Sequence, residues 1–310
     1  MRVRSIAAAL LFACATGRPA AAQHTFRSGV DLVRVDALVT DGRRGVTGLH
    51  AADFELRDNG VAQTIDEISL ESLPLTVTFV LDTSGSVAGP KMQNLASAVG
   101  LILKGLRKED RAALVTFSHR VWLRTPLTSE LQQVRRVLTE ADAAGGTSLH
   151  DAVYAGLALS ETQGARALVL VFSDGMDNAS WLGADTVERA ARRADAVVYS
   201  VAVGAGVAPA FGASTSGVRM TTRPDYLPGQ TAFLDRMASA TGGRVIKADT
   251  TGNLPRAFDD ILQEFRTRYL ITYSPRGVDT PGWHTIDVKV KGRRADVRAR
   301  RGYERGASRF

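Results

Sequence analysis

Cysteine is almost absent from this chain of 310 residues, in which Cys14 is the only one. A single thiol cannot form an internal disulfide, so the fold must depend on a buried core. Hydrophobic residues make up 45% of the chain, an ordinary share for a globular protein of one or two domains. The sequence also lacks H-E-x-x-H, G-x-S-x-G and P-loop patterns, internal repeats and low-complexity tracts. The motif basis for the common hydrolases and nucleotide-binding enzymes is therefore missing.

The N-terminus contains the only pattern of a targeting segment. Arg2 and Arg4 form a basic start, Ile6–Ala15 is a short apolar run, and three alanines precede Gln23. This combination predicts a cleaved secretory signal peptide at residues 1–22, with an apolar run too short to span a membrane. A lipoprotein processed at Cys14 and a poorly ordered cytosolic tail are the alternatives.

The stretch from Leu75 to Ser86 joins a buried-strand pattern to a polar turn. Its first seven residues, LTVTFVL, are apolar or β-branched, as is typical of a strand buried on both faces. Asp82, Ser84 and Ser86 follow at alternate positions, and Gly85 lets the chain bend between them. Their carboxylate and hydroxyl oxygens suit a hard divalent cation such as Mg²⁺, Mn²⁺ or Ca²⁺. Taken alone, the stretch is equally consistent with a helix N-cap.

Two later segments add further oxygen-bearing side chains. Residues 145–149 (GGTSL) place a threonine hydroxyl just before a helical pattern. Residues 167–172 (ALVLVF) form a second buried-strand run, which also ends in an acidic residue. Thr147 and Asp174 thus add a hydroxyl and a carboxylate to the oxygen-bearing side chains of Asp82, Ser84 and Ser86.

In this order, the five residues resemble the metal-ion-dependent adhesion site of the von Willebrand factor type A (VWA) family. The resemblance covers roughly residues 74–268, and the flanking segments resemble secreted bacterial VWA-related proteins. It implies that Ser84 and Ser86 bind the cation directly, and that Thr147 and the two acids bind directly or through water. It also implies an open coordination position that accepts a carboxylate from a partner protein. Residues 87–89 (VAG) lack the acids that bind an adjacent metal in integrin-type sites, so we expect no second ion.

Strand and helix patterns alternate from residue 75 onward, which predicts a mainly parallel sheet covered on both faces. The VWA resemblance implies a doubly wound, Rossmann-like α/β fold with strand order 3-2-1-4-5-6. Ligands of such sheets bind at the carboxyl ends of the strands, where the order switches direction. The switch falls between the first and fourth strands, which end in Asp82 and Asp174. The six strands are expected at residues 75–81, 112–117, 121–123, 167–172, 197–203 and 244–246.

The regions on either side of this sheet have strand patterns but too few strands for independent cores. Residues 58–60 (DNG) predict a hairpin turn, and residues 286–290 and 297–299 predict a basic hairpin directly after the last helix and strand. We expect the two regions to pair into one small β-sandwich. The predicted organisation is a signal peptide at 1–22, an N-terminal β segment at 23–72, a VWA domain at 73–268 and a C-terminal β segment at 269–310.

Several features near the predicted cation site have simpler explanations. His150 fits the start of a helix, and Asp177 fits a turn or a cap. The triplet Asn178-Ala179-Ser180 matches a glycosylation acceptor, which we interpret as chance. A long loop at residues 204–229 is expected on the same rim, either as a functional loop or as an insertion without a role.

Charge is concentrated near the C-terminus. The formal net charge is +7, and removal of residues 1–22 leaves +4 because three arginines and no acid are lost. Residues 289–309 contain nine Lys or Arg and two acids. The cluster at residues 289–301 offers an alternative function, binding to nucleic acid or to an anionic envelope surface. Its charges alternate with apolar residues, however, which favours a solvated strand face.

The resulting hypothesis is a secreted or periplasmic module that binds a carboxylate of a partner protein through a divalent cation, with Mg²⁺ favoured over Mn²⁺ or Ca²⁺. The sequence positions no general base, so we expect no enzyme. The alternative from another class is a hydrolase that uses the cation as a Lewis acid. We expect neither a nucleic-acid partner nor a transmembrane span.

Overall fold

The computed structural model describes residues 32–42, 44–70, 73–87, 89–139, 145–160, 165–203, 231–248 and 251–306. The predicted signal peptide, Cys14 and the loop at 204–229 lie outside these residues. The described residues form one compact unit. A search of the described helices finds none with the length and apolar character needed to cross a membrane.

Six strands form the central sheet: β6 (Leu75–Asp82), β7 (Arg111–Phe117), β8 (Val121–Thr128), β9 (Arg166–Ser173), β10 (Ala196–Val203) and β11 (Val245–Ala248). Their order is β11-β10-β9-β6-β7-β8, and all neighbours are parallel except β7 and β8. Counted along the chain, this is the predicted order 3-2-1-4-5-6, and the predicted α/β fold class is confirmed. Every residue of β6 and β9 is buried, as expected for parallel strands covered on both faces.

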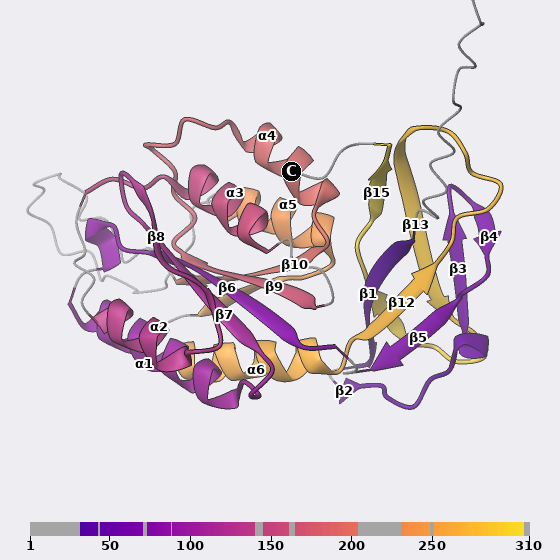
Figure 1. The fold of residues 1–310 in the computed structure, drawn as a ribbon, viewed down its shortest axis with the longest axis horizontal. Coiled ribbons are helices and arrows are strands. Elements are labelled where there is room, and N and C mark those ends of the chain that lie inside the picture. The colour runs from indigo at the N-terminus through magenta and orange to yellow at the C-terminus, as the bar shows by residue number, and fades with distance from the viewer. Residues whose placement is uncertain are drawn as a thin grey trace, which may run out of the picture. The chain divides into compact units, whose positions relative to one another are not determined.

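Helices cover both faces of this sheet (Figure 1). One layer contains α1 (Pro90–Gly105), α2 (Leu131–Thr139) and α6 (Leu254–Arg266), with the short turns η2 (Gly85–Val87) and η3 (Thr251–Asn253) before α1 and α6; the other contains α3 (Leu149–Leu159), α4 (Ala184–Arg193) and α5 (Ala232–Thr241). Successive residues of β6 enter opposite layers, as the pleat of a strand requires. Phe79 packs in the buried cluster with Leu95 and Phe258, whereas Val80 packs in the cluster with Val153.

Two antiparallel sheets are built from both ends of the described chain. One contains β1 (Val33–Asp41), β2 (Arg44–Gly45), β5 (Glu67–Leu70), β12 (Tyr269–Tyr273) and β14 (Asp296–Arg298); the other contains β3 (Phe54–Asp58), β4 (Val61–Gln63), β13 (Gly282–Val290) and β15 (Gly302–Arg305), with η1 (Ala51–Asp53) before β3. Both sheets contribute to one apolar cluster, which includes Val35, Leu56 and Ile271. N- and C-terminal segments therefore combine into a β-sandwich, while the exact domain boundaries at 73 and 268 stay predictions.

The basic C-terminal segment differs from its prediction. Instead of a hairpin, β13 pairs with β3 and β15, whereas β14 pairs with β1 in the other sheet. Alternation in the sequence shows which residues share a face of a strand, but not which distant strand lies beside it. The solvated-face interpretation is also wrong for Arg300, which is buried and donates to Asp195 Oδ1 at 3.0 Å.

Arg268 joins the sandwich to the central sheet at the end of α6. Its fully buried guanidinium donates to the carbonyl oxygens of Asp36 and Gly242, both at 2.8 Å, and to the hydroxyl of Tyr199 at 3.1 Å. Burial raises the pKa of Tyr199 to about 12, so this hydroxyl stays protonated at neutral pH. These bonds fix β1 to the end of α5 and to β10. The short connection from the last helix to the following strand is observed as predicted.

A buried polar cluster lies in the core of the sandwich around Asp58. Its Oδ2 accepts hydrogen bonds from the hydroxyls of Tyr273 at 2.9 Å and Tyr303 at 2.8 Å, and its Oδ1 lies 2.8 Å from Nδ1 of His284. The other ring nitrogen of His284 lies 2.6 Å from the carbonyl oxygen of Thr280. Burial, with the negative charge of Asp58, raises the pKa of both tyrosines above the ordinary value. Donors thus satisfy both oxygens of this carboxylate.

Candidate functional site

Asp82 is the last residue of β6, and its side chain is completely buried. Its Oδ1 accepts the backbone N–H of Ser84 at 2.8 Å, and its Oδ2 accepts the hydroxyl of Ser173 at 3.0 Å. Burial raises the pKa of Asp82, hydrogen bonds from Ser84 and Ser173 lower it, and the charge of Asp174 raises it. Among the described residues, no basic side chain bonds to this carboxylate. Its desolvation is therefore only partly offset by the protein.

The turn after Asp82 is held against the neighbouring strand β7. The backbone N–H and the hydroxyl of Thr83 both donate to the carbonyl oxygen of Phe117, at 2.7 and 3.0 Å. Ser84 is buried beside it. Ser86 lies in η2, and its side chain is outside the described part of the structure. The first loop thus begins from a fixed backbone at the carboxyl end of β6.

The loop around Thr147 is fastened to the loops on both sides. The N–H of Gly85 donates to the carbonyl oxygen of Gly145 at 3.3 Å. Asn178 accepts the N–H of Thr147 on its Oδ1 at 2.8 Å and donates its own N–H to the Thr147 carbonyl at 3.0 Å. A Cβ at Gly146 would lie 2.8 Å from Asn178 Oδ1, so glycine permits this close approach. The buried Thr147 is therefore held between the other two loops.

Asp174 follows β9 directly and is partly exposed. Its Oδ1 accepts the N–H of Met176 at 3.0 Å, which fixes the turn after the strand. Because β6 and β9 are parallel neighbours with Leu81 opposite Phe172, Asp82 and Asp174 leave the sheet at the same edge. The structure thus brings together four of the five predicted residues by their loops, with Ser86 placed by its backbone.

His150 and Asp177 have the structural roles that the sequence predicts. Asp177 Oδ1 accepts the N–H of His150 at 3.2 Å and the hydroxyl of Ser180 at 2.5 Å. Ser180 in turn accepts the N–H of Asp151 at 3.2 Å. These side chains satisfy N–H groups at the start of α3, as capping residues do. Nδ1 of His150 lies 3.2 Å from the carbonyl oxygen of Leu182.

Sequence reasoning missed three residues that support the site: Thr83, Ser173 and Asn178. The signal for Ser173 was its hydroxyl at the end of a buried strand, directly before an acid. Its Oγ both donates to Asp82 and accepts the N–H of Gly175 at 3.1 Å. The Asn178 triplet that resembled a glycosylation acceptor instead fastens the second loop to the third.

The side chains at this edge fit a divalent cation of the Mg²⁺ type. Carboxylate and hydroxyl oxygens are the ligands that hard cations prefer. A cation would also offset the charge of a buried carboxylate that lies near a second acid and has no basic partner in the described structure. The described residues include no group of three or more His, Cys, Asp or Glu suited to a metal. Hydroxyls would therefore have to complete the ligand set.

Comparisons with known proteins match this region. The sequence model of the von Willebrand factor type A domain matches residues 77–176. Inter-alpha-trypsin inhibitor heavy chain H4 from Bos taurus is 25% identical over 241 residues, which is 72% of this chain and 24% of the relative. Heavy chain H2 from Sus scrofa is 33% identical over 90 residues, which is 27% of this chain and 10% of the relative. The chain thus spans a quarter or less of the length of these curated relatives.

Among solved structures, the D319A mutant of the PilB minor pilin from Streptococcus sanguinis superposes with a TM-score of 0.50. The match covers 63% of this chain and 62% of the pilin, at 13% sequence identity. At this identity the likeness concerns the fold alone, and it agrees with the central sheet and its two helical layers.

Proposed function

Since this chain contains a von Willebrand factor type A domain, a domain that commonly mediates protein–protein interactions, we propose that it binds a partner protein through Mg²⁺. The observation that carries the proposal is the set of three loops, fastened to one another beside a buried carboxylate that lacks a basic partner in the described structure. The proposed ligands are Asp82, Ser84, Ser86, Thr147 and Asp174.

The residues of the chain prepare this site before any partner arrives. Ser84 and Ser173 hold both oxygens of Asp82, so the carboxylate has a fixed orientation. Asp174, at the rim, is open to solvent in part. When bound, the cation supplies attraction for a further carboxylate, because two acids and neutral hydroxyls leave coordination positions for water or a ligand. A partner with an exposed Asp or Glu fits this chemistry.

A catalytic role is not proposed for these loops. His150 is engaged with Leu182 and Asp177 at the start of α3. His119, which borders Gly145, is exposed and lies 3.4 Å from the hydroxyl of Ser118, and no acid in the described structure orients it. A general base must be positioned toward the proton it removes, and neither ring meets this requirement.

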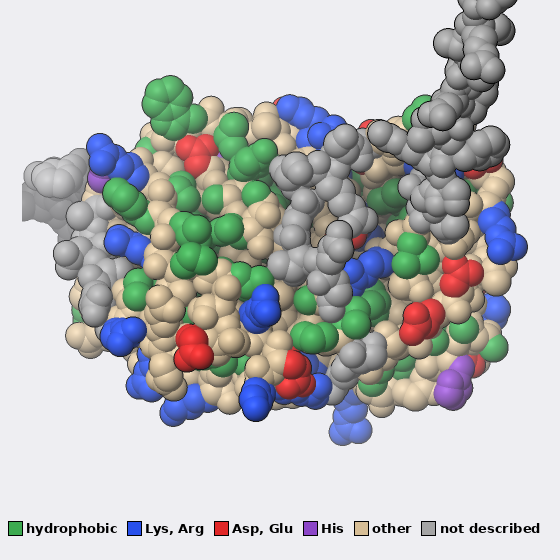
Figure 2. Space-filling view, viewed as in Figure 1, with side chains coloured by type: hydrophobic (Ala, Val, Ile, Leu, Met, Phe, Trp, Pro, Cys, Tyr) green, Lys and Arg blue, Asp and Glu red, His purple; other side chains and the backbone are tan. Residues whose placement is uncertain are grey.

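A role as a binder of anionic surfaces is also less well supported. Several basic side chains of the C-terminal segment pair with acids: Lys289 with Asp287, Arg298 with Glu264, and Arg300 with Asp195. On the face shown in Figure 2, basic side chains are interspersed with acidic and hydrophobic ones. The pairing favours a structural use of these charges.

Export of the protein is part of the proposal and rests on the predicted signal peptide. We expect the mature chain to begin at Gln23. N-terminal sequencing of protein recovered from outside the cytoplasm tests this. A first residue at Cys14, carrying a lipid, would replace a free module with a membrane-anchored one.

Isothermal titration of Mg²⁺ tests the metal site. The wild type is expected to bind the ion, and Asp82→Ala is expected to lose binding while keeping its circular dichroism spectrum. Asp185→Ala is the matched control, because Asp185 is an exposed acid in the first turn of α4. Equal binding by Asp82→Ala and the wild type would rule the site out.

A further inference from the structure

Trp181 is 96% exposed, which is unusual for the largest apolar side chain. It lies in the loop between β9 and α4, the same loop that begins with the proposed ligand Asp174. Met176, also in this loop, is 50% exposed. The loop that contributes to the metal site therefore also presents two large apolar side chains to solvent.

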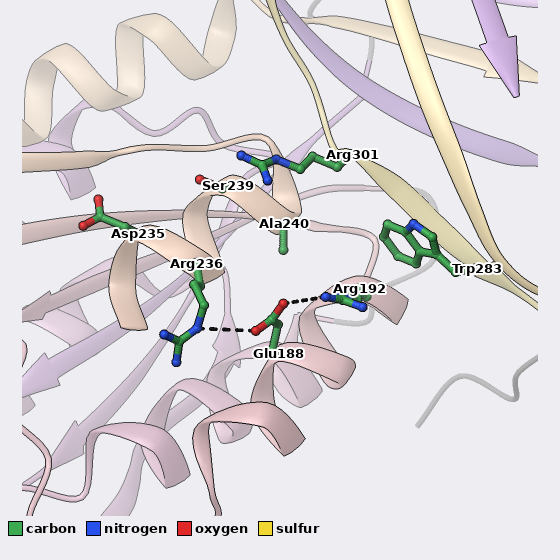
Figure 3. A pocket seen from close by; sticks show the side chains of 8 residues that line it. All are labelled: Glu188, Arg192, Asp235, Arg236, Ser239, Ala240, Trp283 and Arg301. Carbon is green, nitrogen blue, oxygen red and sulfur yellow. Dashed lines mark hydrogen bonds and ion pairs between the residues drawn. The ribbon is translucent and has the colours of Figure 1, made fainter. Parts of the chain in front are cut away.

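The other two tryptophans have cationic partners within the chain. The guanidinium of Arg124 lies 5.6 Å from the ring of Trp122, and that of Arg192 lies 5.0 Å from the ring of Trp283. The second pair lines a cavity of about 310 Å³, where Arg192 also bonds to Glu188 (Figure 3). In the described structure, no such ring or cation contact involves Trp181.

Trp181 is exposed even though its backbone is held firmly. Its N–H donates to Asp151 Oδ2 at 3.0 Å, and the N–H of Leu182 donates to Asp151 Oδ1 at 2.9 Å. The N–H of Asp151 donates to Ser180 at 3.2 Å, so bonds run both ways between α3 and the loop. A side chain on a fixed backbone loses less conformational entropy when it binds, which favours recognition.

The same bonds place Trp181 near the proposed metal. Asp151 lies in the first turn of α3, four residues after Thr147. Thr147 precedes the helix, and its carbonyl oxygen accepts the N–H groups of Asn178 at 3.0 Å and Ala179 at 3.1 Å, so the loop contacts the Thr147 backbone two residues before Trp181. The exposed apolar side chains and the proposed ligands therefore belong to the same loop and its direct neighbour.

We propose that Trp181 and Met176 form a docking platform for a protein segment whose carboxylate reaches the cation at Asp82 and Asp174. This inference rests on the proposed function and specifies the partner chemistry. The segment carries an Asp or Glu and, on the same short stretch, an aromatic or large aliphatic side chain. Tryptophan is among the residues that most often anchor protein interfaces.

The probe for this platform is a phage-displayed library of random 12-residue peptides, captured in Mg²⁺ and eluted with EDTA. Wild-type protein is expected to select peptides that combine an acid with an aromatic or large aliphatic residue. Trp181→Ala is expected to keep the acid in the consensus and lose the apolar residue. It is also expected to bind a peptide selected on wild type at least fivefold more weakly, with unchanged Mg²⁺ affinity. Trp122→Ala, the matched control, should behave as wild type.

The outcomes separate the platform from the metal site. Binding by Trp181→Ala that is weakened less than fivefold would overturn the platform and leave the metal proposal intact. If wild type yields no EDTA-eluted peptides, or Asp82→Ala yields the same ones, both proposals fail. Acrylamide quenching of a Trp122→Phe/Trp283→Phe variant adds an independent check. Strong quenching is expected, and a protected indole would show that the chain itself covers Trp181.

Discussion

In the sandwich, Asp58 meets hydroxyl and imidazole groups, whereas at the edge of the central sheet Asp82 lies near a second acid. Both carboxylates are fully buried at the end of a strand. Asp58 has Tyr273, Tyr303 and His284 as partners. The partners of Asp82 are an amide and hydroxyls, with no basic group among the described residues.

Burial of a carboxylate therefore does not by itself identify a binding site. A buried carboxylate whose donors come from its own fold stabilises that fold, and removing it leaves those donors unpaired. A buried carboxylate near another acid has its charge only partly offset by the fold, and the proposed cation would offset the rest. The two aspartates should therefore respond in opposite ways to substitution and to metal.

The largest effect is expected from Asp58→Ala. It leaves two tyrosine hydroxyls and His284 without their acceptor in the sandwich core, and breaking such a buried pair costs about 3–5 kcal/mol. Urea unfolding followed by circular dichroism measures the loss, with Asp185→Ala as the reference. Mg²⁺ binding by the folded fraction should be unchanged. A loss below about 1 kcal/mol would show that the cluster is not structural.

Asp82→Asn is expected to separate metal binding from folding. Wild type should gain about 2.7 kcal/mol of unfolding free energy in Mg²⁺ at a hundred times its Kd, and the variant should gain none. Burial raises the pKa of Asp82 in the folded state. The stability that its carboxyl contributes at low pH is therefore lost as the pH rises through this raised pKa. At pH 7 in EDTA, the variant should therefore be at least as stable as wild type. Destabilisation in EDTA by more than about 1 kcal/mol would place Asp82 in the same class as Asp58.

Tyr303→Phe removes one of the two hydroxyls on Asp58 and should lower the unfolding free energy by about 1.5 kcal/mol, as for a hydrogen bond to a charged group. The raised pKa values of Tyr273 and Tyr303 add a pH dependence. Above about pH 10 the unfolded chain releases tyrosine protons that the folded chain retains, so stability falls as pH rises. Urea unfolding between about pH 9 and pH 11 brackets the ordinary tyrosine pKa of about 10. Over this range the unfolding free energy of the variant should fall less steeply than that of the wild type. If the unfolding free energies of the variant and the wild type fall equally steeply with pH, the hydroxyl of Tyr303 does not bond to Asp58 as the structure shows.

The smallest effect concerns Asn178, which holds the Thr147 loop. Asn178→Ala removes one hydrogen bond of about 1 kcal/mol and should raise the Kd for Mg²⁺ about fivefold. Asn178→Asp keeps an acceptor at the same position, so its Kd for Mg²⁺ should be closer to that of the wild type. Calorimetry compares the two. An unchanged Kd in the alanine variant would mean that Thr147 does not need this support.

Local patterns predicted much of the fold. The run of apolar residues before Asp82 is the buried strand β6, because a strand covered on both faces needs no polar alternation. Asn59 and Gly60 both have positive φ, 46° and 81°, and connect Asp58 to its partner Val61 in a tight hairpin. The order of the central strands followed from the family resemblance.

Long-range partners could not be predicted in this way. In the sequence, Asp58 is only the first residue of a turn. Tyr273 and His284 lie 215 and 226 positions away from it. Likewise, no periodicity shows that Asn178 reaches back to the backbone of Thr147. Such contacts depend on how distant strands and loops pack, which a local pattern does not encode.

The most direct test of the central claim is anomalous diffraction from crystals of the wild type soaked in Mn²⁺, a cation with the same preference for oxygen ligands. One strong peak is expected within bonding distance of the oxygens of Asp82, Ser84, Thr147 or Asp174, and none beside Asp58. If no peak lies at Asp82, or if a peak lies beside Asp58 instead, the proposed metal site is wrong.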